Sequence, residues 1–119
     1  LIEEKSNTIC DLYDCTFHLD KTWNGLPVLV NDKSLTEFVK KNATDLLGEH
    51  NVIPMDHLTL GEDFAIYLEK IPGVFWVLGV CPLEQESMPP LHNPGMAPDE
   101  NAMKAGIALM VENCVRMLG

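Results

Sequence analysis

The sequence predicts an α/β fold in which helices cover a sheet. Residues 74–80 are the most apolar run of the chain and show no polar alternation, which is typical of a strand buried on both faces. Residues 101–118 follow the most regular helical pattern. Between them, residues 89–100 form a loop that contains four prolines and His92. Ligands of open α/β sheets bind beyond the carboxyl ends of the strands, so His92 is a candidate site residue.

Composition bounds the function classes. With 119 residues, 46% of them hydrophobic, the chain has the size and the apolar content of one domain. Its net charge of −10 argues against nucleic acid and anionic membranes as partners, since both are bound by clustered Lys and Arg. No apolar run approaches the roughly 20 residues of a membrane span. The early charges Glu3 and Glu4 predict no signal peptide, and a cytoplasmic location is expected.

The four cysteines, Cys10, Cys15, Cys81 and Cys114, include no Cys-x-x-Cys pair, which argues against a structural zinc site. Their density is low for a disulfide scaffold. The sequence therefore predicts buried free thiols, as is usual in a cytosolic protein.

The first two dozen residues do not complete a fold on their own. Residues 1–14 have helical apolar spacing, and residues 15–23 alternate like a half-buried strand before Asn24 and Gly25 break the pattern. A single strand has nothing to pair with, so we expect this part to need partners outside the sequence.

The middle of the chain predicts one strand and one helix. Residues 26–30 are a short apolar run beside a proline. Ser34 and Glu37 are spaced as a capping box, and Gly48 is a typical helix stop, which predicts a helix over residues 34–47. A glycosylation triplet begins at Asn42 and is interpreted as chance, because it lies on a helix.

The remaining elements are a short strand at residues 52–55, a helix over residues 61–71, the strand at residues 74–80, and the last helix. Gly61 begins the first of these helices, and Pro72 with Gly73 stops it. In the last helix Gly106 is expected to allow close packing. The expected buried stripe of that helix consists of Met103, Ile107, Met110, Val111, Cys114 and Leu118.

Four histidines could carry chemistry, and each alone is weak. His18 is expected to be exposed or structural, and His50 to interact with the C-terminal dipole of the preceding helix. A site made of His57, Asp63 and His92 is conceivable, although no ligand spacing supports it.

Three motifs, in order, resemble the C-terminal part of the zinc-peptidase amidohydrolases, a family of hippurate hydrolases, auxin-conjugate hydrolases, aminoacylases and carboxypeptidases. The resemblance covers nearly the whole chain but only the last part of a family member. The motifs are Gly-Leu-Pro-Val-Leu-Val-Asn-Asp at residues 25–32, Gly-Glu-Asp-Phe-Ala at residues 61–65, and Pro-Leu-His-Asn-Pro at residues 90–94.

The resemblance implies that His92 ligates one ion of a two-metal centre of zinc or manganese. The family's other ligands and its general base come from an Asp-x-His segment and a Glu-Glu pair. This chain has no such segment, and its one Glu-Glu, Glu3-Glu4, lies at the wrong place. Catalytic residues are therefore expected to be absent from this segment. Gly61 and Glu62 are candidate substrate-binding residues, or merely a helix cap, since the serine that the family places before Glu-Asp is missing.

The resemblance also implies a doubly wound catalytic domain, of which residues 25–119 are the C-terminal part. Residues 1–24 would be the last helix and strand of an inserted α/β lid domain, often used for homodimerisation. The intact protein would hydrolyse the amide bond of N-acyl amino acids or small peptides. The alternative is a non-catalytic truncated paralogue or split subunit that serves as an interaction module.

Overall fold

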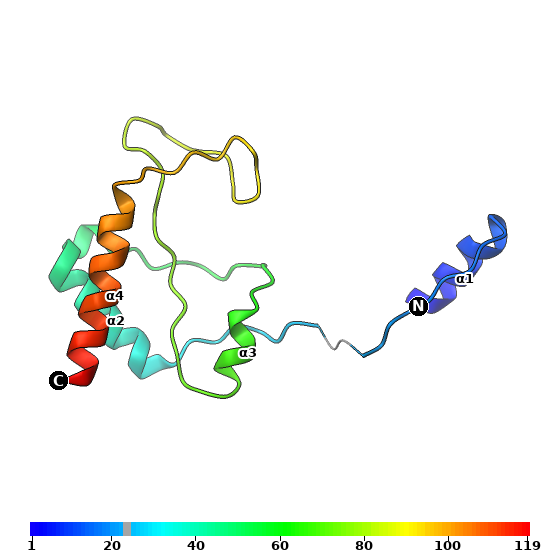
Figure 1. The fold of residues 1–119 in the computed structure, drawn as a ribbon, viewed down its shortest axis with the longest axis horizontal. Helices are drawn as coiled ribbons and strands as arrows, with labels where there is room; N and C mark the ends of the chain where they lie inside the picture. The colour runs from blue at the N-terminus through cyan, green and yellow to red at the C-terminus, as the bar shows by residue number, and fades with distance from the viewer. Residues whose placement is uncertain (23–24) are drawn as a thin grey trace.

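The computed structural model describes residues 1–22 and 25–119, and all regular structure in these ranges is helical (Figure 1). The elements, in order, are α1 (Ile2–Leu12), α2 (Lys33–Leu47), the 3₁₀ helix η1 (Glu49–Asn51), α3 (Phe64–Leu68) and α4 (Ala102–Leu118). None of the helices in the described ranges is long and apolar enough to cross a membrane.

The expected strands are not paired in the part of the chain that the structure describes. No β-ladder forms at residues 15–22, 26–30, 52–55 or 74–80. The expected end of the first strand, at Trp23 and Asn24, lies outside the described residues. A strand needs a neighbouring strand for its backbone groups, and the described residues show no backbone hydrogen bond between any two of these segments. The doubly wound sheet therefore stays a prediction from the family resemblance.

Along residues 74–80 half-buried and exposed residues alternate, as in an extended chain. Trp76, Leu78 and Val80 are half-buried, whereas Phe75 is 36% and Val77 is 52% exposed. The described residues thus do not cover both faces of this segment, and burial on both faces stays a prediction. Its second face is apolar but has no neighbouring layer in the described chain.

The core is the contact between α2 and α4, which lie side by side (Figure 1). Ala43 on α2 and Leu109 on α4 are buried, and Gly106 is buried with them; the other buried apolar side chain of the described residues is Ala65 on α3. A Cβ atom at Gly106 would lie 3.0 Å from Leu78 Cδ2, so the glycine allows residues 74–80 to approach the helix, as expected.

Polar side chains join the same two helices. Asn42 is buried, and its Nδ2 donates to Asn113 Oδ1 at 2.8 Å. Arg116 Nη1 donates to Asn42 Oδ1 at 2.9 Å and to Asp45 Oδ2 at 2.7 Å. Both the nitrogen and the oxygen of the Asn42 side chain are thus hydrogen-bonded and buried, which agrees with interpreting the glycosylation triplet as chance.

The expected buried stripe of α4 is wrong, because α4 buries the face that carries Gly106 and Leu109 instead. At Gly106 the missing side chain leaves room for Leu78, which approaches from residues 74–80. All six residues of the expected stripe are exposed: Met103, Ile107, Met110, Val111, Cys114 and Leu118. We call these six residues the α4 stripe.

Three helix boundaries differ from expectation. The N-cap of α2 is Asp32 and not Ser34: Asp32 Oδ1 accepts from Leu35 N at 2.9 Å and from Ser34 Oγ at 2.6 Å. Gly48 ends α2 as predicted, with a φ of 87° that only glycine adopts readily. Helix α3 has five residues and not eleven, because single turns replace its expected first and last residues.

Helix α1 confirms the expected first helix, but it is not part of the contact between α2 and α4. It lies apart from the other elements (Figure 1), contacts none of the other described helices, and contains no buried residue. One exposed ion pair of 2.7 Å links Lys21 to Glu3. The radius of gyration, 20.5 Å, exceeds the roughly 13–14 Å of a compact chain of this length.

The cysteines are free, as predicted, but they are not buried. Cys10 is half-buried, and Cys15, Cys81 and Cys114 are exposed. The expectation of buried thiols fails because the elements that carry them have uncovered faces.

Candidate functional site

Two consecutive turns order the loop that carries His92. Asn93 N donates to Pro90 O at 3.2 Å, and Met96 N donates to Asn93 O at 3.0 Å. The side chain of Asn93 supports the second turn, because its Oδ1 accepts from Gly95 N at 2.8 Å. The predicted non-helical loop is confirmed, and its shape is held by its own backbone bonds.

His92 has a backbone conformation that the sequence did not reveal. Its φ is 70°, in the left-handed region, and among the described non-glycine residues only Asp14 shares a positive φ. His92 occupies the third position of the turn 90–93, where a positive φ is typical of a type II turn. For a side chain with a Cβ this costs about 1–2 kcal/mol, so the exposed imidazole stands on a strained, well-defined point of the chain.

The other candidate ligands do not gather around His92. Within residues 1–22 and 25–119, no three His, Cys, Asp or Glu side chains lie close enough together to hold a metal ion. The conceivable site of His57, Asp63 and His92 is therefore wrong for this structure. His18, His50 and His57 are all exposed, and His50 lies in η1 directly after α2.

Gly61 and Glu62 lie just before α3. Glu62 Oε1 accepts from Phe64 N at 3.1 Å, which caps the first free amide of the helix. A Cβ at Gly61 would lie 3.2 Å from Leu26 Cδ1, so the glycine also permits close passage of the segment before α2. A five-residue helix has little dipole to offer an anion. The structure thus gives Glu62 a capping contact, while substrate binding at Gly61 and Glu62 stays a prediction.

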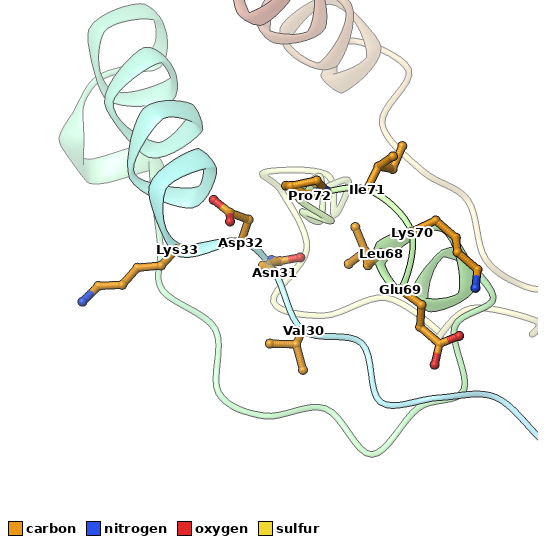
Figure 2. Close-up of a pocket in the computed structure, with 10 residues that line it drawn as sticks. Val30, Asn31, Asp32, Lys33, Leu68, Glu69, Lys70, Ile71 and Pro72 are labelled. Atoms are coloured by element: carbon orange, nitrogen blue, oxygen red, sulfur yellow. The ribbon is translucent and has the colours of Figure 1, made fainter.

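An open cleft of about 490 Å³ lies between the start of α2 and the end of α3 (Figure 2). Residues 30–33 line one side of it and residues 68–73 the other. Asp32 N donates to Gly73 O at 2.9 Å, which joins the two sides. His92 does not line the cleft, so the cavity and the predicted metal ligand are separate features of this structure.

The charges around the cleft do not converge on a common point. Hydrogen bonds from the Ser34 hydroxyl and then from the Leu35 amide lower the pKa of Asp32, so its carboxylate is committed to capping α2. In Figure 2 the Lys33 side chain points away from the cleft, on the side opposite to Glu69 and Lys70. We find no pairing of acid and base here that would support proton transfer.

Sequence reasoning missed the role of Asn31. Its Nδ2 donates to Phe75 O and its Oδ1 accepts from Phe75 N, both at 2.8 Å. The available signal was the Asn-Asp pair that ends the motif at residues 25–32. Asn31, the first residue of the pair, bonds to the backbone of Phe75 in the extended segment 74–80. Asp32, the second, caps α2.

Comparison with known families gives one match over almost the whole chain. Residues 3–115 match the model of peptidase family M20/M25/M40. No solved structure matches the chain.

Three relatives show the range of similar proteins. IAA-amino acid hydrolase ILR1-like 4 of Arabidopsis thaliana is 34% identical over 92 residues, which are 77% of this chain and 21% of the relative. A Rhodococcus jostii protein provisionally named glutamate–cysteine ligase 2-3 is 34% identical over 89% of this chain and 14% of its own length. Probable hydrolase sll0100 of Synechocystis sp. is 29% identical over 86% of this chain and 26% of its own length. The chain thus spans about a quarter or less of these relatives.

Proposed function

The chain belongs to peptidase family M20/M25/M40, and from this premise we propose that it is the C-terminal part of a metal-dependent amidohydrolase. The proposed reaction of the intact protein is hydrolysis of the amide bond of an N-acyl amino acid or small peptide. The observation that carries the proposal is the family match over residues 3–115. The name of one relative, an IAA-amino acid hydrolase, supports the substrate class.

The family is generally metal-dependent, and we propose His92 as a ligand of one of two divalent ions, zinc or manganese. Such ions polarise an amide carbonyl and lower the pKa of a bound water. Three protein ligands are usual for a catalytic zinc. His92 is the one metal ligand that the family resemblance assigns to this chain. The described residues contain no group of three His, Cys, Asp or Glu side chains that could hold a metal ion. We therefore assign no catalytic step to the chain alone.

Two features of the loop support the assignment of His92. Its backbone is held by the turns 90–93 and 93–96, so the imidazole has little backbone freedom to lose on binding. The left-handed φ of 70° is also unusual for a histidine, and such outliers gather at functional sites.

The exposed apolar side chains suggest where the rest of the catalytic domain would pack. Val28 is 85%, Val30 is 69% and Val77 is 52% exposed, and each lies on a segment whose other side is half-buried. Burying apolar side chains stabilises by about 25 cal/mol per Å², which favours a covering layer. We propose that residues 25–119 complete their core with the part of the family fold that the match to relatives leaves uncovered.

We further propose that residues 1–24 belong to a lid domain that mediates homodimerisation. In support, α1 packs against none of the other described helices, and its apolar residues Ile2, Ile9 and Leu12 are exposed. A cytoplasmic location likewise stays part of the proposal.

The second candidate is a non-catalytic paralogue or split subunit that acts as an interaction module. The exposed α4 stripe favours it, because an apolar helix face is a common protein-binding surface. The full reading frame discriminates the two: the enzyme requires an Asp-x-His segment and a catalytic Glu-Glu pair upstream.

The test is an assay of the intact protein that contains this chain. It should release amino acids from N-acyl amino acids, lose that activity to a chelator, and recover it with zinc or manganese. A pure, folded intact protein that binds divalent metal but hydrolyses none of these amides would contradict the proposed function.

A further inference from the structure

Helix α1 ends in a turn that places two cysteines side by side. Cys15 N donates to Cys10 O at 3.0 Å, and Tyr13 N donates to the same oxygen at 3.1 Å. Asp14, between them, has a φ of 49°, in the left-handed region. A backbone hydrogen bond from residue i+5 to residue i, with a left-handed residue at i+4, is characteristic of a Schellman helix end.

In a Schellman helix end, the two residues joined by this hydrogen bond usually carry apolar side chains that contact each other. Here both positions are cysteines, one half-buried and one exposed. Burial raises the pKa of the Cys10 thiol, and so do a hydrogen bond with the Cys15 side chain and the charge of Asp11. The backbone bond from Cys15 N to Cys10 O holds the two cysteine residues together across the turn.

We propose that Cys10 and Cys15 form a redox-active dithiol that closes to an intramolecular disulfide by exchange with a small-molecule disulfide. This inference is independent of the proposed hydrolase function. The oxidised form ties the last turn of α1 to the segment that leaves it, and so locks the helix end.

The exchange has two balanced steps. The exposed Cys15 thiolate attacks one sulfur of oxidised glutathione and forms a mixed disulfide. The S–S bond of glutathione breaks, and one glutathione thiolate leaves with its electron pair. The Cys10 thiolate then attacks the Cys15 sulfur of the mixed disulfide, and the second glutathione leaves. Two protein thiols are oxidised, one glutathione disulfide is reduced to two thiols, and the two protons pass to solvent or glutathione.

Because the pKa of Cys10 is raised, its thiolate is scarce at neutral pH, and the second step should accelerate as the pH rises. The charges that face Cys10 are Asp11 on α1 and Cys15 beyond the turn. No other described helix packs against α1. The segment after the turn returns to α1, where Lys21 pairs with Glu3 at 2.7 Å.

The test uses the full chain carrying Cys81→Ser and Cys114→Ser, so that only the pair remains. It is treated with oxidised glutathione and digested with trypsin, which cuts at Lys5 and Lys21. The peptide of residues 6–21 should be two hydrogens lighter than its reduced form and carry no glutathione. An Asp-specific protease, which cuts between the cysteines, should then leave the fragments linked.

Two variants at Asp14 test whether the turn causes the reaction. Asp14→Gly keeps the left-handed conformation at no cost, whereas the β-branched side chain of Asp14→Val disfavours it. Ring closure should be roughly tenfold slower in Asp14→Val than in Asp14→Gly. Circular dichroism confirms that α1 is equally formed in both.

Two results would overturn the proposal. One is a peptide that carries glutathione on both cysteines and never closes. The other is equal closure rates in the two Asp14 variants, which would mean that proximity in the sequence, and not the helix end, brings the thiols together.

Discussion

The side-chain amide of Asn31 pairs with the backbone of Phe75 as a second strand would, donating to its carbonyl and accepting from its N–H at 2.8 Å each. The two residues are 44 positions apart in the chain. Together with the bond from Asp32 N to Gly73 O, this pairing joins the segment after α3 to the start of α2.

The Asn31 pairing predicts a local loss of protection. In Asn31→Ala, hydrogen exchange of the Phe75 amide should be about 5–10 times faster, because a net hydrogen bond contributes about 1 kcal/mol. Asn31→Asp retains the acceptor and should keep most of the protection. Asn51→Ala, which removes a side-chain bond to Leu47 O, is the control and should leave Phe75 unchanged. Equal exchange in Asn31→Ala and the natural sequence would refute the pairing.

Acid should loosen the contact between α2 and α4. Hydrogen bonds from Arg116 and then Lys41 lower the pKa of Asp45, so its stabilising contribution is present above the unfolded pKa of about 3.9 and is lost as the pH falls through the lower folded value. NMR of the Asn42 amide from pH 5 downward should report the change. Asp45→Asn should remove this part of the pH dependence, and Asp56→Asn, at an exposed site, should not. A pH response unchanged in Asp45→Asn would exclude the ion pair as its cause.

The isolated chain should fold poorly. The α4 stripe and the Val28–Val30 and Phe75–Val77 faces expose apolar surface, and the chain is less compact than a globular domain of its length. A thermal melt followed by circular dichroism should show a broad, gradual loss of helix. A sharp cooperative transition of the monomer would contradict this expectation.

The isolated chain should also lack amidase activity. With zinc, manganese or cobalt added, it should not hydrolyse N-acyl amino acids above the rate of the metal alone, because the described residues contain no group of three metal-binding side chains. Turnover by the rigorously purified chain would reveal a site that these residues do not show.

In the intact protein, His92→Ala should lose about one metal equivalent and most of kcat, because one ion loses a ligand. His92→Gly separates the ligand from the strained backbone: it should lose metal equally but be more stable than the Ala variant, since glycine accepts a φ of 70° freely. His18→Ala, His50→Ala and His57→Ala should keep their metal. Metal analysis after dialysis decides, and full metal content in His92→Ala would remove the assignment.

Much of the helical structure was predictable, because its signals are local. The pattern of residues 101–118 and the stop at Gly48 gave α4 and the end of α2 within one residue. The cap of α2 was misplaced by two residues, since Ser34 and Asp32 both suit the role and only the folded backbone shows which one accepts from Leu35.

For the site, the residue pattern around His92 was enough to propose the family and the ligand. The positive φ of His92 was not predictable, because turns of this kind normally place glycine there. The pairing of Asn31 with Phe75 was equally hidden, since nothing in either local sequence points to the other.

What the sequence by itself determined was the positions of the four α-helices, the non-helical character of the proline-rich loop and membership of the family. An α-helix satisfies its backbone within one segment, so local residues decide it. Only the tertiary structure decided which face of α4 is buried and whether residues 74–80 pair as a strand. Those outcomes depend on neighbours: α4 buries the face of Gly106 and Leu109, and residues 74–80 form no ladder with another described segment.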